Sequence, residues 1–294
     1  MSDVDAGSGH CGKTANPIVA VAQVSSVLGD PDANIASTAR WMHNAAAQGA
    51  QLTVFPECTL SGYMMDSRTQ VEDAAVAITG QRLAPLIEAA SATCTFAVVG
   101  LLERDGDKVY NSAVLIGPDG VAGTYRKQHL PRLGADLFVD PGDGVAPRVY
   151  EAGPLRVGIM ICFDLRFPES ARELALGGAD VIAMPTNWPL TAGFLADHMT
   201  RVRAVENLVY VAVADRCDRE SDTDFLGRSQ VVAPSGEVLV DAGTAEGIVV
   251  TSVDVTQSRT KTLTFDDPPF SLPVFQGRRP ELYSALTRPT APPT

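Results

Sequence analysis

A cysteine in a polar turn after an apolar run is the first candidate for chemistry in this chain. Cys162 follows residues 157–161, which are too apolar to be exposed and too few for a long helix, so they predict a buried strand. A helix is expected over residues 168–176. A strand-to-helix turn offers a thiolate backbone N–H groups and exposure at the end of the sheet. Taken alone, Cys162 could equally be a core residue, because free cysteine is among the most buried residue types.

A glutamate and a lysine leave apolar segments in the same manner. Residues 52–55 predict a strand that ends at Pro56, and Glu57 follows it as a possible general base. Lys127 lies in a segment that follows a third strand-like run, and it could be a fixed cation. Each charge taken singly is more simply a solvated group at a strand end. The three residue types together favour a thiol nucleophile with a base and a cation.

The sequence resembles the nitrilase-type carbon–nitrogen hydrolases over nearly the whole chain, from about Pro17 to Tyr283. The resemblance implies that Glu57, Lys127 and Cys162 are the family's glutamate, lysine and cysteine triad. The motifs that carry it are VFPE with LSGY (54–57 and 60–63), YRKQHLP (125–131), ICFDLRFPE (161–169) and RAVEN (203–207), supported by GRSQVVAPSG and RRPELY.

These residue types suit the hydrolysis of a carbon–nitrogen bond. Glu57 would take the thiol proton while Cys162 attacks a carbonyl carbon. Lys127 and the backbone N–H of Phe163 would stabilise the oxyanion that forms. Glu57 would then protonate the leaving ammonia or amine and activate the water that hydrolyses the thioester. The prediction is therefore a hydrolase for non-peptide carbon–nitrogen bonds.

The loop after the lysine departs from the family pattern, which usually has a second glutamate there. In LGADLFVDPGD, Asp136 is either a shortened substitute, which would hold Lys127 charged or orient the substrate amide, or a solvated loop acid. The residues after Cys162 resemble the amidase and carbamoyl-amidase branches, so an amide substrate is favoured over a nitrile. Asp164 and Arg166 are expected to form an ion pair that shapes the turn.

Asn187 and Trp188 at a third strand end, and Tyr63 at the LSGY turn, are candidate substrate-binding residues. Trp188 could equally pack under a loop. Two further alternatives remain open at this point. Cys162 could pair with His129 or His198 in a cysteine–histidine hydrolase, or the chain could be a catalytically silent binding or assembly protein of the same fold. A Cys162 of low pKa, labelled selectively, would favour an enzyme.

An internal repeat predicts the fold. An alanine-rich helical segment leads into residues 52–55 and Pro56, and another leads into residues 181–184 and Pro185. Later in each half, an apolar run precedes a turn with Pro and Gly that suits a hairpin. Two similar halves whose sheets pack together predict an α/β fold, a four-layer α-β-β-α sandwich. The resemblance implies the same fold, commonly paired into homodimers or larger homo-oligomers.

The domain organisation follows from composition. We expect a flexible leader at residues 1–16, one carbon–nitrogen hydrolase domain at 17–260 and an extended proline-rich arm at 261–294. The 294 residues are 45% apolar, which suffices for a large core. Five cysteines without CxxC spacing do not predict a disulfide framework, and His10 with Cys11 is a weak metal signal, so neither metal nor cofactor is expected.

The charge and hydropathy of the chain limit its partners. A net charge of −12 disfavours sequence-independent nucleic-acid binding, which needs a basic surface. No apolar run approaches the length that crosses a bilayer, and no signal segment is recognised. The expected protein is a cytoplasmic enzyme whose partners are a small amide-type substrate and water.

Overall fold

Two six-stranded sheets form the centre of the protein in the computed structural model, which describes residues 16–146 and 148–288. The first sheet contains β1 (Ile18–Gln23), β2 (Leu52–Val54), β3 (Phe96–Asp105), β4 (Lys108–Gly117), β5 (Gly120–Arg126) and β14 (Gly247–Ser252). The second contains β6 (Val149–Ala152), β7 (Leu155–Ile159), β8 (Val181–Pro185), β9 (Tyr210–Ala214), β12 (Gln230–Val232) and β13 (Val238–Asp241).

The two sheets share one pattern of parallel and antiparallel strand pairs. In the first, the order is β14-β1-β2-β3-β4-β5, with β1, β2 and β3 parallel and the other strands antiparallel to their neighbours. In the second, the order is β13-β12-β9-β8-β7-β6, and β7, β8 and β9 form the corresponding parallel centre. The predicted hairpins are β4–β5 and β12–β13. The prediction of two similar halves is confirmed.

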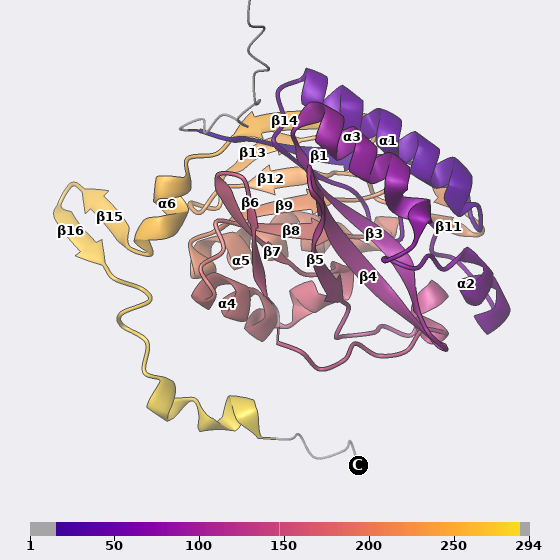
Figure 1. Cartoon of the computed structure of the whole chain (residues 1–294). Coiled ribbons are helices and arrows are strands. Elements are labelled where there is room, and N and C mark those ends of the chain that lie inside the picture. Colours follow the sequence, from indigo (N-terminus) through magenta and orange to yellow (C-terminus); the bar gives the residue numbers. More distant parts are fainter. Residues whose placement is uncertain (1–15, 147, 289–294) are drawn as a thin grey trace, which may run out of the picture.

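Helices cover the outer face of each sheet (Figure 1). The helices α1 and α3 pack on the first sheet, and α4 and α5 pack on the second. The predicted α-β-β-α sandwich is therefore correct. The helices are α1 (Pro31–Ala47), α2 (Arg68–Ala74), α3 (Ala84–Thr93), α4 (Pro168–Leu176), α5 (Thr200–Asn207) and α6 (Val255–Thr260).

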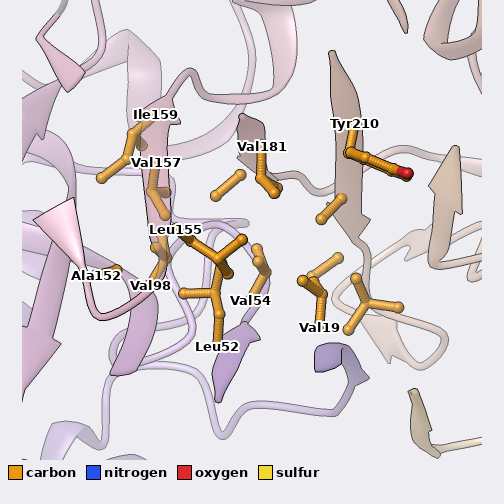
Figure 2. Packing of buried hydrophobic residues seen from close by; sticks show 14 of the residues in the cluster. Val19, Leu52, Val54, Val98, Ala152, Leu155, Val157, Ile159, Val181 and Tyr210 are labelled. Atoms are coloured by element: carbon orange, nitrogen blue, oxygen red, sulfur yellow. The ribbon is translucent and has the colours of Figure 1, made fainter. Parts of the chain in front are cut away.

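The main core lies between the sheets because strand side chains alternate between two faces. In β8, Val181 belongs to the cluster between the sheets, whereas Ile182 belongs to the cluster under the helices. Figure 2 shows the cluster between the sheets, where Val54 of the first sheet and Leu155 and Val157 of the second pack together. Full burial of such a side chain contributes roughly 1.5–3 kcal/mol to folding.

The segment after β2 crosses β3 at very close range, and glycine makes this possible. A Cβ at Gly100 would lie 2.4 Å from the carbonyl oxygen of Pro56 and 2.7 Å from the Cα of Glu57. Such contacts are too short for a carbon atom, so the backbone of Glu57 depends on Gly100. The packing of the first sheet thus fixes the position of one candidate catalytic residue.

The C-terminal segment leaves the body of the protein (Figure 1). It was expected to be extended, but β15 (Leu263–Asp266) and β16 (Pro269–Leu272) pair as a hairpin, followed by two short turns of 3-10 helix. Another short hairpin, β10 (Arg219–Glu220) with β11 (Thr223–Asp224), lies between β9 and β12. Residues 1–15 of the expected leader, including His10 and Cys11, lie outside the described residues.

Candidate active site

Three predicted site residues form a buried ionic cluster. Lys127 follows β5, and its Nζ lies 2.6 Å from Oε1 of Glu57 and 2.6 Å from Oδ2 of Asp136. All three side chains have no exposed surface. Asp136 belongs to a short 3-10 helix, Gly134–Leu137, in the loop after Lys127. The interpretation of Asp136 as a solvated loop acid is wrong, because the side chain is buried and paired.

The backbone of Glu57 is held by the second sheet. Its N–H donates to the carbonyl oxygen of Thr186 at 3.4 Å, and Nδ2 of Asn187 donates to its carbonyl oxygen at 2.9 Å. Thr186 and Asn187 directly follow β8. Asn187 was predicted as a substrate-binding residue, and the structure places it against the backbone of Glu57. Strand ends from both sheets therefore meet at this carboxylate.

Cys162 lies beside the cluster in a strained turn. It follows β7 with a φ of +46°, a left-handed conformation that costs a non-glycine residue about 1–3 kcal/mol. The charges of Glu57 and Lys127 both act on its thiol, and residues 186 and 187 at the end of β8 lie near it. The structure thus brings the predicted cysteine, glutamate and lysine together.

Asp164 maintains this turn through partners that the sequence did not predict. Its Oδ2 accepts the N–H of Ile161 at 2.9 Å and the hydroxyl of Tyr125 at 2.7 Å, and its Oδ1 lies 2.6 Å from Nδ1 of His129. The predicted ion pair with Arg166 is wrong. Asp164 is buried, whereas Arg166 is exposed, and the ion pairs of the described residues do not join them.

The cysteine–histidine alternative has no support from these positions. His129 is bound to Asp164, and its ring stacks on Phe167 with centroids 3.7 Å apart. His198 packs against Phe194, with ring centroids 4.8 Å apart. The carboxylate whose charge acts on the Cys162 thiol is that of Glu57.

Burial and charge shift the pKa values of the site. Burial raises the pKa of the Cys162 thiol and the Glu57 carboxylate raises it further, against the opposing effect of the Lys127 charge. Burial also raises the pKa of Glu57, and the charge of Asp136 adds to this, although Lys127 opposes it. Burial disfavours the charged form of Lys127, but the two carboxylates outweigh it and raise its pKa well above normal.

The pKa of the Cys162 thiol is raised, not lowered. A thiol of raised pKa depends on a nearby base to remove its proton as it attacks.

Tyr63 and Trp188 are both buried. The hydroxyl of Tyr63 donates to Oδ2 of Asp136 at 2.8 Å, so this side chain supports the ionic cluster. Trp188 packs in the cluster under α4 and α5, and its backbone N–H donates to Oδ1 of Asp215 at 2.9 Å. Phe163 follows Cys162 in the turn and contacts Phe167 edge to face.

Asn111 was not identified from the sequence. It lies in β4 with 1% exposure, and its Nδ2 donates to Oε1 of Glu57 at 2.7 Å and to Oδ1 of Asp136 at 2.8 Å. The signal that could have revealed it is a carboxamide followed by a long apolar run, in YNSAVLI. Its partners lie 54 and 25 residues away, so only the fold identifies them.

Metal binding and membrane insertion have no structural indication in the described part of the chain. Across residues 16–146 and 148–288, no three His, Cys, Asp or Glu side chains are grouped so that they could hold a metal ion. Within the same residues, no helix combines the length and the apolar character needed to span a bilayer.

Comparison with known proteins identifies the family. The carbon–nitrogen hydrolase family model matches residues 18–261. A nitrilase of Pyrococcus abyssi is 40% identical over 268 residues, which are 90% of this chain and 98% of that protein. The human omega-amidase is 34% identical over 275 residues, with 89% and 94% covered. The chain also resembles a solved amidase of Nesterenkonia from the nitrilase superfamily, with a TM-score of 0.76, 25% identity and 95% and 100% coverage.

The chain therefore belongs to the carbon–nitrogen hydrolase family, within the nitrilase superfamily. It is an amidase-like enzyme that acts on carbon–nitrogen bonds other than peptide bonds.

Proposed function

We propose that this enzyme hydrolyses a small amide or an N-carbamoyl compound through a thioester on Cys162. The observation that carries the proposal is the buried cluster of Glu57, Lys127 and Asp136 beside the Cys162 thiol. Oε1 of Glu57 accepts two hydrogen bonds, whereas its buried Oε2 has no partner among the described residues. An unpaired carboxylate oxygen near a neutral thiol is suited to general-base catalysis.

In the first half of the reaction, Oε2 of Glu57 takes the Sγ proton of Cys162 as Sγ bonds to the carbonyl carbon. The carbonyl oxygen becomes an oxyanion, which Nζ of Lys127 and the N–H of Phe163 stabilise. Loss of one such donor typically lowers the rate by about 100- to 1000-fold. The carbon–nitrogen bond then breaks, and the nitrogen leaves as ammonia or an amine with the proton from Glu57.

In the second half, Glu57 takes a proton from water as the water oxygen attacks the thioester carbon. The carbon–sulfur bond breaks, the acid product leaves and the proton returns to the sulfur. The raised pKa of Glu57 makes it a stronger base than an exposed carboxylate, which suits it for accepting the thiol proton. One carboxylate thus serves both halves of the reaction.

The relatives support a small amide as substrate. One solved form of the Nesterenkonia amidase carries the acetamide moiety of fluoroacetamide on its active-site cysteine, and another binds acrylamide. The human relative is an omega-amidase. A nitrile is the second candidate, because the relative from Pyrococcus abyssi is named a nitrilase. A catalytically silent binding or assembly protein is disfavoured, since the ionic cluster beside the thiol is complete.

A homodimer or larger homo-oligomer in the cytoplasm is the proposed form of the enzyme. Large apolar side chains on the C-terminal segment are exposed, which favours burial against a second copy. These side chains are Phe265, Phe270, Leu272, Leu282 and Leu286. Sedimentation of the full chain and of Leu282→Glu would test this, since a monomeric full chain contradicts it.

The experiment for the reaction measures ammonia release from amides, N-carbamoyl amino acids and nitriles. Cys162→Ala and Glu57→Gln should each abolish release. Mass spectrometry of a rapidly quenched reaction should find the acyl group on Cys162. Release that survives Cys162→Ala contradicts the mechanism, and release from nitriles alone contradicts the amide substrate. The absence of turnover across the whole panel would favour the catalytically silent alternative.

A further inference from the structure

Asn111 holds the two carboxylates of the ionic cluster at once. Its Nδ2 carries two protons and donates one to Oε1 of Glu57 at 2.7 Å and the other to Oδ1 of Asp136 at 2.8 Å. Lys127 joins the same two carboxylates from its own side, through Oε1 of Glu57 and Oδ2 of Asp136. The carboxylates are thus bridged by one cation and one neutral amide.

The orientation of the amide is set by its surroundings. Oδ1 of Asn111 lies 3.7 Å from Sγ of Cys58, a thiol that can donate a weak hydrogen bond. The reversed amide would turn its oxygen toward two carboxylates and leave each with one donor fewer. The side chain is 1% exposed, so water cannot replace the lost bonds. The local charges therefore require the nitrogen to face the cluster.

This arrangement distinguishes the two oxygens of Glu57. Oε1 accepts from Nζ of Lys127 at 2.6 Å and from Nδ2 of Asn111, whereas Oε2 is buried without a partner among the described residues. We propose that Asn111 is a positioning residue that fixes the rotation of the Glu57 carboxylate and so makes Oε2 the proton acceptor for Cys162. This inference rests on the proposed function.

An aspartate of the same shape could not do this. It would replace the two amide donors by a third acid in a site where Glu57 and Asp136 already repel each other. The hydrogen bond from the Asn111 amide to Glu57 favours the ionised carboxylate, which is the form that acts as a base. Loss of the amide should therefore leave Glu57 both poorly oriented and protonated up to a higher pH.

The test compares Asn111→Ala and Asn111→Asp with the wild type. Asn34→Ala is the matched control, because Asn34 is also a buried asparagine, but it bonds to the backbone of Val27 and Leu60. The readouts are kcat and KM across pH for an amide that the wild type hydrolyses, and the rate of Cys162 alkylation by iodoacetamide across pH, followed by mass spectrometry.

Both Asn111 variants should lower kcat by about 100-fold, as expected for a misplaced reacting group, with KM changed much less. The acidic limb of both pH profiles should move up by about one pH unit or more, because a charge-assisted hydrogen bond is lost. Asn34→Ala should destabilise the fold and leave the acidic limb in place. If one Asn111 variant does not fold, the other gives the result, since the acidic limb is expected to move in the same direction in both variants.

Unchanged kcat and an unchanged acidic limb in a folded Asn111 variant would overturn the inference. A lower kcat with an unmoved limb would also overturn it, because it would indicate a structural role only. The alkylation profile needs no substrate, so it tests Asn111 even if the wild type hydrolyses none of the amides. The absence of amide hydrolysis would count against the proposed function, whereas a moved alkylation profile would still support the positioning role of Asn111.

Discussion

Removal of the Lys127 charge should expose the electrostatic strain of the buried cluster. With Lys127 present, the two carboxylates and the ammonium sum to one negative charge, and all three side chains are shielded from water. Lys127→Met keeps a chain of similar length and leaves two uncompensated acids. Breaking one buried ion pair costs about 3–5 kcal/mol, and here one lysine serves both pairs, so we expect about 5 kcal/mol at neutral pH.

The loss should depend on pH with a definite sign. In the variant, Glu57 loses the lysine charge that opposes the effect of burial, so its folded-state pKa should lie still further above that of the unfolded chain, which is near 4. The folded variant then binds more protons than the unfolded one over this interval. The contribution of this carboxyl group to stability should be fully present below about pH 4 and should be lost as the pH rises through the raised folded-state pKa.

Urea unfolding monitored by circular dichroism from about pH 5 to pH 8 tests this expectation. Lys127→Met should fall further below the wild type as the pH rises. Addition of Glu57→Gln and Asp136→Asn to the same chain makes the cluster neutral and should recover much of the loss. Arg82→Met is the control, since the ion pair of Arg82 with Asp32 is exposed and should matter little. A deficit that is equal at both ends of the pH range would refute the reasoning.

Three further substitutions test the residues that hold the backbone near the site and in the second sheet. Gly100→Ala should displace Glu57 and lower kcat by about 100-fold, whereas Gly247→Ala, where a Cβ meets nothing within 4 Å, should leave kcat unchanged. Asp164→Ala should cost about 3 kcal/mol in urea unfolding and should slow Cys162 alkylation, because the turn loses its buried anchor. Two arginines lower the pKa of the Asp180 carboxylate although the carboxylate is buried. Asp180→Asn removes this carboxylate, so in urea unfolding the wild type should lose stability more steeply than the variant below about pH 4.

The sequence predicted the fold because its periodic features are local. Each apolar run that leads to a proline, and each hairpin turn, can be recognised within about ten residues of chain. The two halves repeat these features in the same order, so the matching sheets followed from them. The positions of Glu57, Lys127 and Cys162 just after strands could also be predicted, since each lies next to an apolar run in the chain.

The contacts between distant polar groups could not be predicted in this way. Arg166 lies two residues from Asp164 and was the obvious partner, but the 3-10 turn leaves Arg166 exposed and aims Asp164 at Tyr125 and His129, 39 and 35 residues away. Tyr63 was predicted to bind substrate, and its hydroxyl donates a hydrogen bond to Asp136, 73 residues away. Such pairings depend on the exact rotation of each strand end, which apolar periodicity does not specify.

The second carboxylate has a clear physical purpose in the proposed reaction. When Glu57 takes the thiol proton, it becomes neutral and loses most of its attraction for Lys127, at the moment when the oxyanion forms. The ammonium can then turn its attraction toward the oxyanion, and the net charge of the site stays at one negative. Asp136 takes no part in this proton transfer, so its contact with Nζ at 2.6 Å holds Lys127 in place throughout. An aspartate has one methylene fewer than a glutamate, and the hydrogen bonds from Tyr63 and Asn111 hold it at the distance where it can do this.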